Sequence, residues 1–223
     1  ALSANTTGAK NTAVGRAALQ STTTQSNNTA LGYNALSSGS NTGAANTGIG
    51  QDVLSGNTTG SNNTSIGAGS MENNSTGSSG TAVGKGSLAA NTTGANNTSV
   101  GYNSLVSNTT GSSAVAVGYG ALAAHTTDTG NVAVGYNALT SHTTADGGYN
   151  VAVGYAALDA NTDGHSNIGI GKNALGANTT ADNNTAVGTN ALLTNTTGAN
   201  NVAVGSAALD GNTTASDNIA IGL

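Results

Sequence analysis

An aliphatic residue followed by glycine recurs along the whole chain at a nearly constant spacing. Ten of the twelve intervals between the glycines of this pair are 17 residues long, one is 18 and one is 19; the glycines are Gly15, Gly32, Gly50, Gly67, Gly84, Gly101, Gly118, Gly135, Gly154, Gly171, Gly188, Gly205 and Gly222. Four residues after each of the first twelve stands Leu or, once, Met71. An apolar column that keeps its register over twelve repeats predicts a repetitive fold, and it argues against a disordered tract.

Each repeat contains one short strand pattern, as in Asn131-Val-Ala-Val-Gly-Tyr-Asn-Ala-Leu139. The residues one and three before the glycine share a face, because side chains alternate along a strand. The nearer residue is always aliphatic, and the farther one is Thr in the first half of the chain and mostly Val or Ile later. We expect this face to be buried. The opposite face carries only Ala, Ser and Gly, so we expect it to be flat and nearly bare.

A repeat of 17 residues is too short for a helix, a strand and two loops, and its many Gly, Asn and Thr residues disfavour helix. Two or three short strands per coil, stacked in parallel, predict an all-β parallel β-solenoid of about twelve coils. Adjacent coils would lie about 4.8 Å apart. The absence of proline agrees with this fold, because proline would remove ladder donors. We expect residues 1–223 to form a single array that is a fragment of a longer fibre, since neither end carries a capping repeat.

Two asparagine columns accompany the strands. One precedes each strand, at Asn11, Asn28, Asn46, Asn63, Asn97, Asn131, Asn150, Asn167, Asn184, Asn201 and Asn218; the other contains Asn57, Asn74, Asn91, Asn108, Asn161, Asn178, Asn195 and Asn212. Asparagine tolerates turn conformations, and stacked amides can hydrogen-bond from coil to coil. We therefore predict a structural role for both columns.

The predicted core of each coil is thin, with one Val, one Leu and one Thr or Val. We therefore expect the bare Ala/Gly face or the Leu column to pack against sister chains. Closed cyclic symmetry is the usual arrangement for such contacts.

The Asn-Thr-Ala-Val-Gly-Tyr-Asn-Ala-Leu type of strand, followed by Asn-Thr-Thr-Gly, resembles the head repeats of trimeric autotransporter adhesins. It is similar also to repeat arrays of phage tail-fibre-like proteins, and the resemblance covers essentially all 223 residues. The resemblance implies a left-handed β-roll, three chains per fibre and an adhesive or structural role outside the cell, at a cell surface or on a virion. Partners would be sister chains, in a trimer or polymer, and a cell-surface glycan or protein receptor. The 17-residue coil is longer than that of the adhesin heads.

Composition and motifs argue against several classes of function. Only 6% of the residues are charged, the net charge is −5 and there are four Lys and Arg residues, which argues against a nucleic-acid partner. The chain has no cysteine and no apolar run long enough to span a membrane. Neither a phosphate-binding loop nor a Ser-His-Asp arrangement stands out. We predict that the chain is not an enzyme and holds no cofactor.

Two histidines are the strongest candidates for a metal site. His125 and His142 occupy the second asparagine column in successive coils, so we expect them to stack near the surface, with Asp128 and Asp146 in nearby turns. No third ligand recurs at a suitable spacing, so we predict that they are polar replacements for asparagine and that no metal binds. His165 lies in a different turn.

The tyrosines are the main candidates for a binding surface. Five of the six stand directly after the repeat glycine, and the sixth lies in the 19-residue coil; the candidate residues are Tyr33, Tyr102, Tyr119, Tyr136, Tyr149 and Tyr155. A stripe of such rings can bind sugar rings or a partner, or it can cover an interchain groove. The 18-residue coil around Ser37 to Asn46 and the 19-residue coil around Asp146 to Tyr149 are further candidates, because insertions in solenoids emerge as loops.

Ice binding is the alternative function. Two threonine columns would give regular hydroxyl ladders, one at Thr58, Thr92, Thr109, Thr126 and Thr143 and the other at Thr59, Thr93, Thr110, Thr127 and Thr144. Neighbouring residues of a strand face opposite ways, so only one column per strand would face water.

Overall fold

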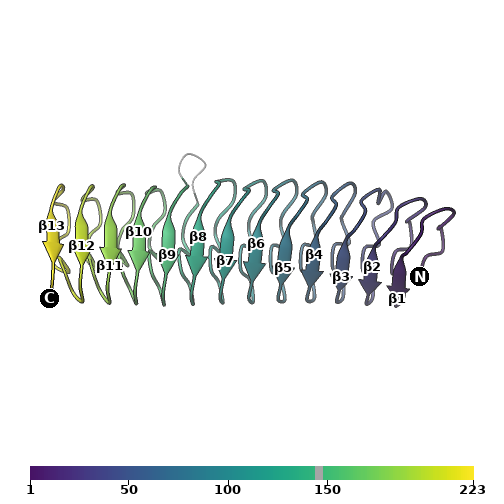
Figure 1. Ribbon diagram of the computed structural model, residues 1–223, viewed down its shortest axis with the longest axis horizontal. Helices are drawn as coiled ribbons and strands as arrows, with labels where there is room; N and C mark the ends of the chain where they lie inside the picture. The colour runs from purple at the N-terminus through teal and green to yellow at the C-terminus, as the bar shows by residue number, and fades with distance from the viewer. Residues whose placement is uncertain (144–147) are drawn as a thin grey trace. The chain divides into compact units, whose positions relative to one another are not determined.

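The computed structural model describes residues 1–143 and 148–223, which form two compact units, residues 1–113 and 114–223. Every coil contributes one strand of three residues, and the described part of the chain contains no helix. Unit 1 holds β1 (Thr12–Val14), β2 (Thr29–Leu31), β3 (Thr47–Ile49), β4 (Thr64–Ile66), β5 (Thr81–Val83) and β6 (Thr98–Val100) (Figure 1). Unit 2 holds β7 (Val115–Val117), β8 (Val132–Val134), β9 (Val151–Val153), β10 (Ile168–Ile170), β11 (Thr185–Val187), β12 (Val202–Val204) and β13 (Ile219–Ile221).

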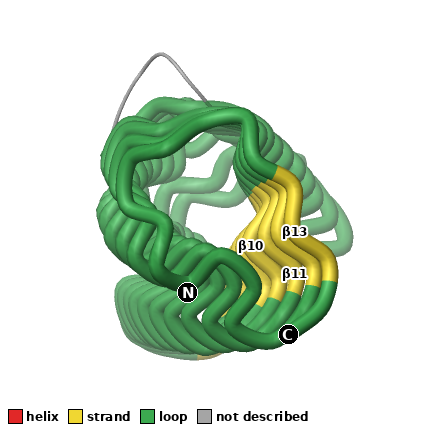
Figure 2. Tube along the Cα trace, turned by 90° about the vertical axis from the view of Figure 1, so that its left-hand side faces the viewer, coloured by secondary structure: helices red, strands yellow, loops and turns green. Residues whose placement is uncertain are grey.

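Within each unit, every strand pairs in parallel with the strand of the next coil. Thr12 lies opposite Thr29, Thr29 opposite Thr47 and Val132 opposite Val151, so the register follows the repeat through both irregular intervals. The strands of unit 2 lie one behind another on one side of the coils (Figure 2). The predicted all-β parallel β-solenoid with a 17-residue repeat is confirmed.

Each coil has one regular strand, where the sequence predicted two or three. Most of the remaining described backbone forms turns and bends, yet it still hydrogen-bonds from coil to coil: the Leu54 amide donates to the Ser70 carbonyl at 3.2 Å, and the Thr58 amide donates to the Ser75 carbonyl at 2.9 Å. The proline-free composition therefore reflects ladders that extend well beyond the strands.

Left-handed backbone conformations close the coils. The column two residues after the repeat glycine has positive φ, for example 50° at Asn137, and so does the residue before many first-column asparagines, for example 60° at Asn183. Asn and Gly tolerate this region better than other residues do. Part of the Asn and Gly content of the chain therefore follows from the turns. The Leu column shares the conformation, with φ of 51° at Leu139.

The interior of each coil is formed by the Leu column and by the middle residue of each strand. Leu139 and Ala133 are both fully buried, whereas Val132 and Val134 on the other side of β8 are only partly buried. The prediction that the Val and Thr columns form the buried face is therefore wrong, and the Ala/Ser/Gly face is the inner one.

The small residues face inward because the interior of each coil is narrow. A Cβ placed on Gly48, a middle residue, would lie 3.2 Å from Val53 Cγ1 and 3.5 Å from Leu36 Cδ1. Leucine reaching across from the turn thus leaves room for nothing larger than Ala or Ser, and the β-branched residues point outward. The expectation that the Ala/Gly face or the Leu column contacts sister chains is also wrong, because both lie inside the coil.

Buried asparagine side chains link the coils. Asn74 Nδ2 donates to Asn57 Oδ1 at 2.8 Å and to the Gly77 carbonyl at 2.9 Å, while Asn91 Nδ2 donates to Asn74 Oδ1 at 2.7 Å. In the first column the amide oxygen accepts from the backbone instead, as from Asn46 N to Asn28 Oδ1 at 2.9 Å. The predicted structural role of the asparagine columns is confirmed.

Candidate interaction surface

The outward face of the sheet is lined almost entirely by β-branched side chains. Its members are the first and third residues of every strand, and each is Val, Ile or Thr except Leu31. In unit 2 all but Thr185 are aliphatic, and Val204, Ile168 and Ile170 are 36–39% exposed. No residue of this surface is charged. We call it the outer sheet face.

Three of the predicted tyrosines stack on one another in unit 2. The ring centroids of Tyr119 and Tyr136 are 5.1 Å apart with planes 9° from parallel, and those of Tyr136 and Tyr155 are 5.2 Å apart with planes 6° from parallel. The three residues are 46–55% exposed. Tyr119, Tyr136 and Tyr155 therefore form a continuous stack, which we call the tyrosine ladder.

Two tyrosines of unit 1 lie beside cationic side chains. In unit 1, the Arg16 guanidinium lies 5.5 Å from the centroid of the Tyr33 ring, and Lys85 Nζ lies 6.0 Å from that of Tyr102. Both are cation–π arrangements. Tyr149 lies outside the post-glycine column and is 68% exposed, so it does not extend the ladder.

The two column histidines lie inside the coil. His125 and His142 are fully buried, with ring centroids 6.2 Å apart, so the expectation that they stack near the surface is wrong. They take the places of asparagines in the buried second column, and the sequence carried no signal that this column faces inward.

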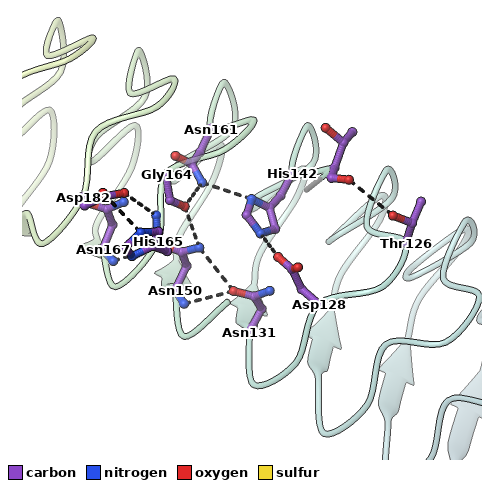
Figure 3. A network of polar contacts seen from close by, with 11 residues as sticks. Thr126, Asp128, Asn131, His142, Asn150, Asn161, Gly164, His165, Asn167 and Asp182 are labelled. Atoms are coloured by element: carbon purple, nitrogen blue, oxygen red, sulfur yellow. Dashed lines mark hydrogen bonds and ion pairs between the residues drawn. The ribbon is translucent and has the colours of Figure 1, made fainter. Parts of the chain in front are cut away.

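A buried acid pairs with the second of these histidines. His142 Nε2 lies 2.5 Å from Asp128 Oδ2, with the two side chains 0% and 1% exposed (Figure 3). Asn161 Nδ2 lies 3.2 Å from His142 Nδ1. Because the Asn161 amide N–H can only donate, His142 Nδ1 is the acceptor, and the ring proton lies on Nε2, which donates to Asp128. His142 thus continues the side-chain ladder from Asn161.

Burial in the interior, together with the neighbouring His142, lowers the pKa of His125 from 6.5 to about 4. The His125 side chain is therefore neutral in the folded protein near pH 7. His165, by contrast, is 44% exposed at its side chain, and its Nε2 lies 3.2 Å from Asp182 Oδ2.

Within residues 1–143 and 148–223, no group of three or more acidic, histidine or cysteine side chains is arranged to hold a metal ion. Asp146, which the sequence placed near the histidines, and Thr144, a member of the second threonine column, lie outside the described residues. The 18-residue coil places its extra length at Gly39 and Ser40, both exposed.

The hydroxyls of the first threonine column are already used between coils. Thr58 Oγ1 donates to the Ser75 carbonyl at 2.9 Å, and Thr92 Oγ1 donates to the Thr109 carbonyl at 2.9 Å. The second column is exposed at Thr59, Thr93 and Thr110. One regular column therefore remains for an ice surface.

No protein-family model, curated protein or solved structure matches this chain. In the described part of the chain there is also no helix with the length and apolarity to cross a membrane. Function is therefore inferred from the surfaces that the coils present.

Proposed function

We propose that this chain is a segment of a rigid extracellular fibre that assembles with two sister chains through the outer sheet face and serves surface attachment. The observation that carries the proposal is the uncharged, β-branched outer sheet face. Parallel sheets normally have both faces covered, and only the inner face is covered here, by the Leu column. Contiguous exposed apolar surface of this kind marks a protein contact.

A second copy of the same chain fits this face better than an unrelated partner. The face repeats one residue pattern at every coil, so an identical sheet presents a matching ridge at the same spacing. Closed cyclic symmetry then covers the face of every copy without leaving one exposed. The resemblance of the repeats to adhesin heads supports three copies and a location outside the cell.

The proposal assigns no catalysis. A stiff array held by backbone ladders and buried amides suits a spacer or a platform, and exposed side chains other than those of the outer sheet face remain available for a glycan or protein receptor. Ice binding is the weaker alternative, because flat ice-binding surfaces need more than the one threonine column left exposed. Thermal hysteresis of the purified chain tests it directly.

Replacing Val134 by lysine should abolish assembly. The side chain lies on the outer sheet face, so assembly would bury an unpaired ammonium at a cost of about 3 kcal/mol or more, which weakens association by at least about a hundredfold. Size-exclusion chromatography with light scattering should show a trimer for the parent chain and a monomer for Val134→Lys. Circular dichroism should show the same strand content in both.

Thr197→Lys is the matched control, since it adds the same charge at an exposed position outside the strands. It should remain trimeric. A parent chain that stays monomeric at high micromolar concentration would contradict the proposal, and so would a trimeric Val134→Lys variant.

A further inference from the structure

The tyrosine ladder belongs to a column whose side chains are scarce elsewhere in the chain. The column directly after the repeat glycine contains five of the six tyrosines and three of the four Lys and Arg residues, Arg16, Lys85 and Lys172. It contains no acidic residue, although the chain carries nine Asp and Glu residues. In unit 2 the column reads Tyr119, Tyr136, Tyr155, Lys172, Thr189, Ser206 and Leu223.

The stacking decides which part of the rings faces outward. Tyr136 has one neighbouring ring on each side, nearly parallel to its own, so its two faces are covered. The residue is nevertheless 46% exposed, and with both faces covered the ring edge is the part of the aromatic system left open to a ligand. A sugar that stacks on an aromatic face finds no free face at Tyr136.

Ring edges recognise a different kind of ligand. The edge of an aromatic ring is electropositive and its face electronegative, so edges pack favourably against the face of another ring. Three edges in a row, 5.1 and 5.2 Å apart, offer such contacts to one flat π-surface lying along the stack. The ligand must be long enough to cross two coil spacings, roughly 10 Å.

The next position of the column adds a charge preference. Lys172 stands one coil beyond Tyr155, and a carboxylate or sulfonate at the end of a ligand would meet its ammonium rather than an acidic side chain. We propose that the tyrosine ladder with Lys172 binds elongated, planar aromatic acids along the coil axis of unit 2. This site does not use the outer sheet face and does not depend on the fibre proposal.

Titration of the parent chain with stilbene-4,4′-dicarboxylate tests the site, because this linear planar dye fluoresces more strongly when its central bond is held rigid. The parent should bind with a saturable rise in fluorescence. Tyr136→Leu interrupts the stack and should weaken binding about tenfold, since it removes edge contacts and the continuity of the ladder. Tyr136→Phe keeps the ring and should bind within about twofold of the parent.

Two further variants separate the parts of the site. Lys172→Gln should weaken the dicarboxylate several-fold, whereas Tyr149→Ala, which removes the tyrosine outside the ladder, should change nothing. Light scattering on the same samples reports assembly, so failure of the fibre proposal is distinguished from failure of this one. No saturable binding, equal binding by Tyr136→Leu, or displacement of the dye by the neutral sugar cellohexaose would overturn the proposal.

Discussion

Alanine at Gly135 is expected to destabilise the fold by more than about 4 kcal/mol, a loss of the size that backbone strain combined with a steric clash can cause. Gly135 has a φ of 144°, which L-residues rarely adopt. A Cβ there would lie 2.2 Å from the Gly154 carbonyl oxygen of the next coil. Neither backbone can yield easily, because the Gly135 amide donates to Val117 O and the Gly154 amide to Val134 O, both at 2.8 Å.

Gly211→Ala is the matched control in the same unit. No heavy atom lies within 4 Å of its added Cβ, and its φ is outside the positive region. It should unfold at the parent's denaturant concentration or slightly above it, since alanine restricts the unfolded chain. Urea denaturation followed by circular dichroism at one fixed protein concentration measures both variants. Similar midpoints for Gly135→Ala and the parent would show that the glycine column is not required by the backbone.

The repeat glycine and the leucine column were sufficient to predict the solenoid, because each marks a backbone requirement that recurs once per coil. Alternation alone does not predict which side of each strand faces the interior. Alternation says that Val132 and Val134 share a side opposite Ala133, but it does not say which side is inside. Hydrophobicity favoured the valines, whereas the bore filled by Leu139 admits only the alanine. The space left by the leucine column, and not hydrophobicity, therefore determines which side of the strand is buried.

The candidate site, too, was predictable from the sequence only in part. The common column of the tyrosines follows from the repeat, so their proximity was predictable. The stacking of Tyr136 between two rings depends on rotamers that the spacing does not fix. The burial of His125 was missed for a related reason. Asparagine is mostly exposed in folded proteins and histidine is intermediate, and only the closed amide ladder shows that their column lies inside.

Replacing His125 by asparagine is expected to make the fold more resistant to acid. The folded-state pKa of about 4 lies below the ordinary value of 6.5, so the unfolded chain takes up a proton at this residue before the folded chain does. Stability is therefore lost as the pH falls from about 6.5 to about 4, and no further loss from this group occurs below. A difference of this size corresponds to about 3 kcal/mol.

Asparagine fits the position, because it occupies the same column in most other coils and has no proton to gain. Guanidinium denaturation at pH 7 and pH 4.5 should show a parent that loses about 2 kcal/mol more than His125→Asn does, since this interval covers most but not all of the titration of the group. Carboxylates titrate in the same range in both chains, so they largely cancel from the comparison. If His125→Asn and the parent lose equal stability, the buried histidine takes up its proton without penalty, and the interior of unit 2 must admit water at that coil.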